Sequence, residues 1–217
     1  MSDAVLDRLR RLDACAVSDT LDRLGLPSAV TGIAPRSVRQ RIAGRVRTVK
    51  LEAANGRTAS RHLCTAAIEA ADSGDVIVIE QKSGIDAAGW GGILSVGAKT
   101  KGVAGVIVEG PARDIDEATE LGFPVYARAV TARTARGRII EVATGAPVTI
   151  GEVTVAAGDY ALADSSGVVF IAAAGIERVV AEAEKIAARE AAMAKAAAAG
   201  NPMSQVMGAD YERMLKE

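Results

Sequence analysis

Two short runs of mostly β-branched residues constrain the fold of this chain more than any other feature. They are Val76–Ile79 and Val103–Val108, and runs this short and this apolar are typical of strands buried on both faces. Segments with apolar residues at helical spacing accompany them, over 57–71 and 88–101, and a further strand is expected over 124–127. The middle of the chain is therefore predicted to be a β–α–β–α arrangement, which is typical of an α/β protein.

The regions on either side of this unit follow other patterns. A helix over 13–24 and a strand over 42–51 are expected before it. A short helix over 116–121 and a long, Ala-rich helix over 174–199 are expected in the second half, where the terminal helical tail covers about 174–217. Four short strands are expected between these two helices, over 148–150, 153–155, 160–163 and 168–171.

The composition is that of one globular domain spanning 1–217. Hydrophobic residues make up 49% and charged residues 24% of the 217 residues, and no linker or internal repeat divides them. The formal net charge of −1 and the aromatic content of 3% argue against a nucleic-acid-binding surface. The sequence has no apolar run of membrane-spanning length and no signal peptide at its start. We therefore expect a cytoplasmic protein that binds neither nucleic acid nor a membrane.

Histidine and cysteine are too scarce to build a site of their own. The chain has one histidine, His62, and two cysteines, Cys15 and Cys64, which we expect to be buried free thiols. His62 is interpreted as a packing or hydrogen-bonding residue, with a place in a pocket lining as the alternative. A metal ion would have to be held by carboxylates and water, which favours Mg²⁺ or Mn²⁺.

Three glycines surround the single tryptophan in the segment 89–94, near the start of an expected helix. Glycines let a backbone approach a ligand closely, and free N–H groups at a helix start favour a carboxylate or a phosphate. A tight turn without a ligand explains the pattern equally well. The spacing matches neither a dinucleotide-binding fingerprint nor a P-loop.

A second polar segment, 109–117, directly follows a predicted buried strand. Ligands of open α/β sheets bind beyond the carboxyl ends of the strands. Here Arg113 can bind a carboxylate through two hydrogen bonds, and Asp114 can bind a divalent cation. Glu117 shares a face with Asp114 if a helix starts at this point. An ordinary helix start with acidic residues in its first turn is the alternative.

These segments resemble a known family. It contains the regulator of ribonuclease E activity A, or RraA, and the class II 4-hydroxy-4-methyl-2-oxoglutarate aldolases. Twenty residues separate Gly92 from Arg113, which is the family's spacing between the glycine loop and the Arg-Asp pair. The resemblance extends from 18 to 190, and its landmarks are 73–78, 90–94, 105–110, 113–114, 122–125 and 163–169.

The resemblance implies a fold and an assembly. The fold would be a four-layer α/β/β/α core resembling a swivelling phosphohistidine domain, closed by the long C-terminal helix. The assembly would be a homotrimer or hexamer with active sites between subunits. Glu190 is the best match to an acid that some members contribute from the adjacent subunit.

The resemblance also implies roles for individual residues. Arg113 would hold the pyruvyl oxygens, and Asp114 would ligate Mg²⁺ or Mn²⁺ directly or through water. The aldolases usually carry an aspartate where this chain has Gly92, and Glu117 would restore the missing negative charge as a second acid at the metal. The pyruvate carboxylate would be bound by the backbone of Gly91, Gly92, Ile93 and Leu94.

The function implied is that of a divalent-metal-dependent lyase that forms pyruvate through a metal-stabilised enolate. Its substrate would be a small 2-oxo acid, either a 4-hydroxy-4-methyl-2-oxoglutarate-type molecule cleaved by retro-aldol reaction or oxaloacetate, which is decarboxylated. Decarboxylation needs no base for a hydroxyl proton, so we rank it at least equal to aldolase activity. The alternative is a non-catalytic RraA-like regulator that binds a ribonuclease. A methyltransferase is discounted because no glycine-rich nucleotide loop follows a first strand.

Overall fold

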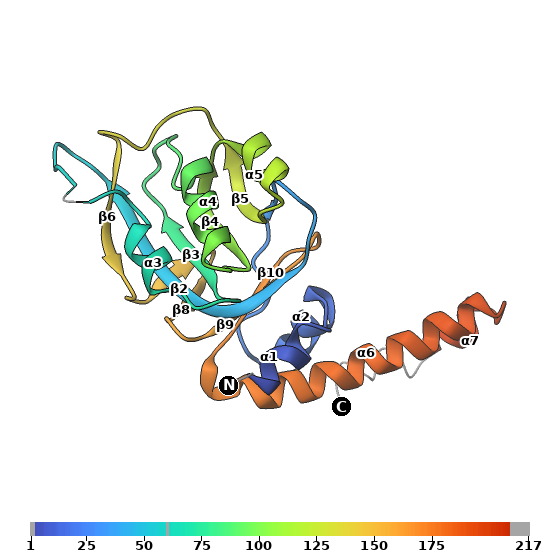
Figure 1. The fold of residues 1–217 in the computed structure, drawn as a ribbon. Helices are drawn as coiled ribbons and strands as arrows, with labels where there is room; N and C mark the ends of the chain where they lie inside the picture. The colour runs from blue at the N-terminus through green and yellow to red at the C-terminus, as the bar shows by residue number, and fades with distance from the viewer. Residues whose placement is uncertain (1–2, 60, 209–217) are drawn as a thin grey trace.

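The computed structural model describes residues 3–59 and 61–208, which form a mixed α/β fold (Figure 1). Its helices are α1 (Ala4–Leu9), α2 (Ala14–Arg23), α3 (Thr65–Ala70), α4 (Gly92–Thr100), α5 (Ile115–Leu121), α6 (Ile176–Ala198) and α7 (Met203–Val206), with a 3₁₀ turn, Ala173–Gly175, before α6. Its strands are β1 (Ala34–Pro35), β2 (Ile42–Ala53), β3 (Val76–Gln81), β4 (Gly105–Ala112), β5 (Val125–Val130), β6 (Ile139–Thr144), β7 (Val148–Ile150), β8 (Val153–Val155), β9 (Tyr160–Ala163) and β10 (Val168–Ile171).

Four parallel strands form the centre of the main sheet, in the spatial order β5-β4-β3-β2. The two β-branched runs lie in β3 and β4, where Val78 is opposite Ile107 and Ile79 is opposite Val108. All four side chains are fully buried. The prediction of strands covered on both faces is therefore confirmed.

The long strand β2 connects two halves of the sheet. Its first residues pair antiparallel with β9, with Gly44 opposite Ala161, whereas Val46 and later residues pair in parallel with β3. The sheet therefore curls into a half-barrel (Figure 1). Gly44 lies at this transition, where a side chain would overlap with the carbonyl oxygen of Gly74. The close approach of the two backbones requires a glycine at this position.

Three apolar clusters separate four layers of secondary structure. Ile79 and Val108 belong to the cluster between the parallel strands and helices α3, α4 and α5. Val78 and Ile107 point to the opposite face and belong to the cluster shared with β7, β8, β9 and β10. Val169 belongs to the third cluster, under α1, α2 and α6. The order of layers is α/β/β/α, as the family resemblance implied.

Only the first half of α6 packs on the domain. Its buried residues all lie within 176–186, and the remainder of the helix extends away from the sheet (Figure 1). Arg8 on α1 and Arg23 on α2 bind α6 through Glu184 at 2.7 Å and Glu182 at 2.5 Å, respectively. Within the described residues, no helix is both long enough and apolar enough to span a membrane.

The helix predicted over 57–71 is wrong in its first half. Among the described residues of this stretch, 57–59 and 61–71, a helix is present only over Thr65–Ala70. Asn55, Gly56 and Cys64 all adopt positive φ angles, and such left-handed residues interrupt a helical path. The Arg57 side chain also donates hydrogen bonds to nearby backbone carbonyls and so stabilises the turn.

The ends of several other elements also differ from the predictions. Strands β4 and β5 continue to Ala112 and Val130, beyond the apolar runs that predicted them. Strand β6 has no counterpart among the strands expected from the sequence, and it pairs with β2 through a shift in register between Lys50 and Leu51. The long C-terminal helix and the four short strands before it are confirmed. The last part of the predicted helical tail, 209–217, lies outside the described residues.

Candidate active site

The tertiary structure brings the glycine loop and the Arg-Asp segment together. The residues before α4 are extended and run beside the end of β4, so the helix predicted over 88–101 begins only at Gly92. The N–H of Gly89 donates to the carbonyl of Pro111 at 2.9 Å, and the N–H of Arg113 donates to the carbonyl of Trp90 at 3.0 Å. These strand-like hydrogen bonds satisfy backbone N–H and C=O groups that would bond within the helix if α4 began earlier.

Trp90 anchors the loop in the core. Its side chain is 1% exposed, its Nε1–H donates to Ser95 Oγ at 2.9 Å, and its ring stacks on Phe123 with centroids 6.2 Å apart. The preceding residue, Gly89, lies so close to Gln81 Oε1 that a side chain at position 89 would overlap with it. The loop is therefore held by close packing and a buried hydrogen bond rather than by the flexibility of its glycines.

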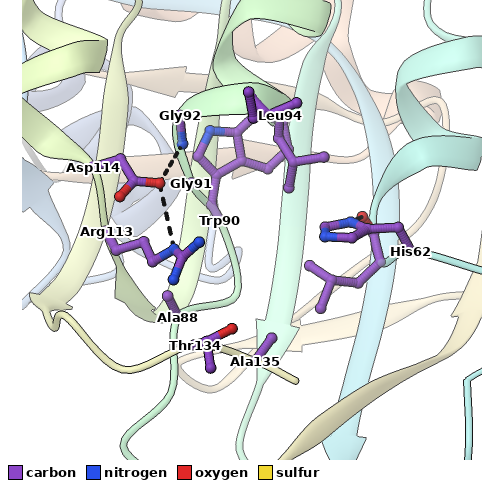
Figure 2. Close-up of a pocket in the computed structure, with 12 residues that line it drawn as sticks. His62, Ala88, Trp90, Gly91, Gly92, Leu94, Arg113, Asp114, Thr134 and Ala135 are labelled. Atoms are coloured by element: carbon purple, nitrogen blue, oxygen red, sulfur yellow. Dashed lines mark hydrogen bonds and ion pairs between the residues drawn. The ribbon is translucent and has the colours of Figure 1, made fainter. Parts of the chain in front are cut away.

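Asp114 is held in an unusual backbone conformation. Its φ of 56° lies in the left-handed region, which costs about 1 kcal/mol for a residue other than glycine. It precedes α5, yet its side chain does not cap that helix. Oδ2 instead accepts the N–H of Gly92 at 2.8 Å and lies 3.3 Å from Arg113 Nε (Figure 2). The carboxylate is thus directed at the start of α4.

The Glu117 carboxylate occupies the space that a side chain at position 92 would fill. A Cβ atom built on Gly92 would overlap with Glu117 Oε2 and would lie 3.2 Å from Asp114 Cβ. Two carboxylates from α5 and its N-terminal turn therefore converge on the N-terminus of α4. Their convergence depends on the missing side chain of Gly92.

These two carboxylates supply hard oxygen ligands of the kind that Mg²⁺ and Mn²⁺ prefer. No group of three or more His, Cys, Asp or Glu side chains suited to a metal ion occurs within the part of the chain that the structure describes. Asp114 and Glu117 would therefore need water, substrate oxygens or a neighbouring subunit to complete a coordination shell. Mg²⁺ commonly keeps several waters and binds through one or two carboxylates, so the pair fits such an ion.

Arg113 and Asp114 border two hollows in the surface. The first has a volume of about 110 Å³ and is lined on one side by Arg113, Asp114 and the segment 90–94 (Figure 2). Its lining also includes His62 and Thr134. The second hollow contains Glu117 together with Val130 and neighbouring residues. The Arg-Asp pair thus separates a pocket of small-molecule size from the second carboxylate.

The histidine lies in the wall of this pocket. His62 is exposed, and its ring points into the pocket opposite Arg113 (Figure 2). The structure thus places His62 in the pocket lining, which was the alternative expectation. Its Nδ1 also lies within hydrogen-bond distance, 3.1 Å, of the Leu63 carbonyl oxygen, in keeping with the hydrogen-bonding role that was favoured. Thr134 was not predicted at all, because it lies in an irregular segment with no motif of its own.

The two cysteines have opposite environments. Both are free thiols; Cys64 is buried, but Cys15 is exposed, so its predicted burial is wrong. Cys15 lies on the solvent-facing side of α2, between Ala14 and Ala16, which point into the core. Burial, followed by the nearby charge of Glu141, raises the pKa of the Cys64 thiol well above its ordinary value.

This difference predicts selective thiol labelling. In native protein at pH 8, Cys15 should react with a thiol reagent about 10²-fold faster than Cys64, because the reactive thiolate is both disfavoured and shielded at Cys64. Absorbance after addition of dithionitrobenzoate measures the two rates. Cys15→Ser should abolish the fast phase, and a fast phase of two thiols per chain would contradict the prediction.

Glu190 does not reach Arg113 within one chain. It lies on α6 in a groove lined by Met193 and Met203 among others, away from both hollows at the Arg-Asp pair. Burial, and then the negative charges of Asp13 and Asp19, raise the pKa of its carboxyl. Its contribution to the active site of a neighbouring subunit stays a prediction.

Known proteins match this chain in sequence. Residues 14–170 match the model of the RraA-like family, described as Aldolase/RraA. The chain is 31% identical over 203 residues to a Halalkalibacterium halodurans protein provisionally named a 4-hydroxy-4-methyl-2-oxoglutarate aldolase, covering 90% of this chain and 91% of the other. It is 26% identical over 201 residues to the protein DlpA of Legionella pneumophila, covering 93% of this chain. This chain spans only 33% of the length of DlpA.

A solved structure matches the fold as well. The crystal structure of Streptomyces coelicolor RraAS2 superimposes with a TM-score of 0.79 at 25% sequence identity, covering 88% of this chain and 95% of the other. That protein is described as an unusual member of the RNase ES inhibitor RraA protein family. The similarity therefore includes proteins named for two different activities, one enzymatic and one inhibitory.

Proposed function

Because the chain belongs to the RraA-like family of aldolases and RraA proteins, we propose that it is a lyase that forms pyruvate from small 2-oxo acids. The substrates are 4-hydroxy-4-methyl-2-oxoglutarate-type molecules, cleaved by retro-aldol reaction, and oxaloacetate, cleaved by decarboxylation. The convergence of Asp114 and Glu117 on Gly92, with Arg113 alongside, is the observation that carries this proposal.

Arg113 and the start of α4 bind the 2-oxo acid end of the substrate. The first N–H groups of a helix have no intrahelical acceptor and favour a carboxylate. Asp114 already accepts the N–H of Gly92, so the N–H groups of Ile93 and Leu94 are left for the substrate. Arg113 adds a positive charge that opposes the build-up of negative charge on the pyruvyl oxygens. Its Nε lies 3.3 Å from Asp114, which orients the guanidinium.

Asp114 and Glu117 hold a divalent cation, Mg²⁺ or Mn²⁺. When bound there, the ion supplies the electrophilic stabilisation that an enolate requires. Because Gly92 has no side chain, the Glu117 carboxylate can occupy the space at position 92, where it replaces the aspartate that the aldolases usually carry. Among the described residues that line the two hollows at this pair there is no lysine, and the single histidine, His62, lies across the pocket from Arg113. Decarboxylation, which needs no such base, is therefore at least as well supported as aldol cleavage.

The proposal is tested by following pyruvate release from oxaloacetate and from 4-hydroxy-4-methyl-2-oxoglutarate. We expect turnover of at least one substrate with Mg²⁺ or Mn²⁺ and its loss after treatment with EDTA. Re-addition of the metal should restore activity, which separates metal loss from denaturation. Absence of metal-dependent turnover of both substrates would refute the lyase and favour the alternative, a regulator that binds a ribonuclease, which a pull-down would detect.

A homotrimer or hexamer with sites between subunits is part of the same proposal. Ile93 is 85% exposed and Val96 is 52% exposed on α4, and Val130 is exposed where β5 ends beside the second hollow. Large apolar side chains grouped at a site are typical of surfaces that a partner covers. Light scattering should therefore give a mass of three or six chains, and charged substitutions at Ile93 and Val96 should lower it.

A further inference from the structure

Glu141, on β6, carries a buried carboxylate that the proposed reaction does not use. Its side chain is only 3% exposed, and a buried charge requires partners. Its oxygen Oε2 accepts the N–H of Cys64 at 2.6 Å, and Oε1 accepts a hydrogen bond from Arg61 Nη2 at 2.6 Å. The Thr144 hydroxyl also donates to Oε1. These bonds give the carboxylate one orientation and tie β6 to the segment before α3.

Cys64 is held in a backbone conformation that is uncommon for a residue other than glycine. Its φ of 67° and ψ of −6° lie in the left-handed region, and such a residue persists only where its surroundings fix it. A hydrogen bond to an ionised carboxylate is about twice as strong as one between neutral groups, so the bond to Glu141 is well suited to hold this turn. Leu63 directly precedes Cys64 and lines the pocket beside Arg113. The backbone angles of Cys64 therefore set the position of this part of the pocket wall.

The side chain of Cys64 also contacts the loop before α4. Its Sγ lies 3.6 Å from the carbonyl oxygen of Gly89, which is within reach of a weak S–H···O hydrogen bond. The N–H of Gly89 donates to the carbonyl of Pro111 on β4 at 2.9 Å, and Gly89 directly precedes Trp90. Leu63, Cys64 and Trp90 belong to one apolar cluster. A displacement of Cys64 would therefore reach both the pocket wall and the glycine loop.

We infer that Glu141 is a positioning residue, which keeps the substrate pocket in its binding geometry by fixing Cys64. Through this one residue it places the pocket wall at Leu63 and the loop at Gly89. The inference rests on the proposed function, because it takes the pocket beside Arg113 to be the site of the 2-oxo acid.

Replacement of Glu141 should weaken binding more than it slows the reaction. The carboxylates proposed to hold the cation, Asp114 and Glu117, lie on α5 and its N-terminal turn, which is neither of the segments that Glu141 fixes. In Glu141→Ala we expect KM for oxaloacetate to rise about tenfold and kcat to change less than about twofold. Glu141→Gln keeps an oxygen that can accept the N–H of Cys64 and should restore most of the affinity. Calorimetry with pyruvate and Mg²⁺ makes the same comparison without turnover.

Two further readings report the geometry directly. Trp90 is the single tryptophan and is 1% exposed, so in Glu141→Ala acrylamide should quench its emission at least about twofold more strongly. In a Cys15→Ser background, the Cys64 thiol of the same variant should react with dithionitrobenzoate at least about tenfold faster. Glu141→Gln removes the same charge but keeps the hydrogen bond, so both readings should stay near those of the wild type.

Glu52→Ala is the matched control. Glu52 also pairs with an arginine of the segment before α3, Arg57 at 3.1 Å, but its side chain is 46% exposed. Its removal should leave KM, quenching and the labelling of Cys64 at wild-type values. Glu141→Asp, which withdraws the carboxylate by one methylene, takes the place of Glu141→Ala if the alanine variant does not fold, and should show smaller changes in the same direction.

The outcomes separate this inference from the lyase proposal. Wild-type quenching and Cys64 labelling in Glu141→Ala would overturn the inference even if the chain forms pyruvate. A fall in kcat with unchanged KM would also overturn it, because a displaced pocket wall acts on binding. In a chain without lyase activity, a pyruvate affinity that depends on Glu141 together with faster labelling of Cys64 would support the positioning role and refute the proposed reaction alone.

Discussion

Replacement of Arg113 by alanine should lower kcat/KM for pyruvate formation by about 10²–10³-fold. Arg113 places a positive charge beside the substrate oxygens, and its guanidinium is held by Asp114 at 3.3 Å. Alanine removes that charge where negative charge develops on the pyruvyl oxygens. A coupled assay with lactate dehydrogenase, which consumes the pyruvate formed, measures the change.

The variant Arg113→Lys tests whether the shape of the guanidinium matters as well as its charge. Lysine keeps the charge but lacks the planar fork that can bind two oxygens in parallel, so most of the loss should remain. The thermal midpoint should hardly change in either variant, because the Arg113 side chain is 39% exposed and exposed ion pairs contribute little stability. An Arg113→Ala variant with wild-type kcat/KM would contradict the assignment of this residue.

The second large effect concerns the exchange of a carboxylate between positions 92 and 117. Gly92→Asp alone should lower activity at least about tenfold, because the new side chain overlaps with the Glu117 carboxylate and adds a third negative charge. Glu117→Ala alone should lower activity by a similar factor, because only Asp114 then remains at the cation. Steady-state kinetics with saturating Mg²⁺ measure both losses.

The double variant Gly92→Asp with Glu117→Ala should recover much of the lost activity. The double variant supplies one carboxylate to the same space from the other side, so its two changes compensate. A double-mutant cycle, which compares the loss in the double variant with the two single losses, should therefore show strong coupling. Gly92→Asn with Glu117→Ala is the matched control, which has nearly the same shape and lacks the charge. A double variant whose loss equals the product of the two single losses would show that the two positions do not share a function.

Much of the fold was predictable because it depends on local periodicity. The β-branched runs in β3 and β4 and the long helix α6 follow directly from the spacing of apolar residues. The error in the first half of the helix predicted over 57–71 has a different local cause. Asn55 and Cys64 take left-handed conformations that helical periodicity does not reveal, and the N–H of Cys64 is held by Glu141, which lies far along the chain.

The candidate site also has one part that the sequence predicted and one part that it did not. Five consecutive residues after a predicted buried strand contain Arg113, Asp114 and Glu117, so the sequence predicted that these side chains lie close together. The sequence offered a place in a pocket only as an alternative for His62 and did not indicate Thr134, because neither residue belongs to a motif. They enter the pocket only through long-range bonds, to Glu141 and Ala88, that hold their segments beside the glycine loop.

The sequence was enough to predict the central strands and the long helix, because apolar spacing and chain propensity act over a few residues, but it did not predict β6 or the irregular segment before α3. It also determined which side chains are chemically able to serve, an arginine and two carboxylates in a chain with a single histidine. The directions of these side chains depend on tertiary contacts. Asp114 turns its carboxylate toward Gly92 rather than its own helix, and Glu117 fills the space beside it. Both outcomes follow from the packing of β4 against the segment before α4, a contact between residues about twenty positions apart that local preference does not specify.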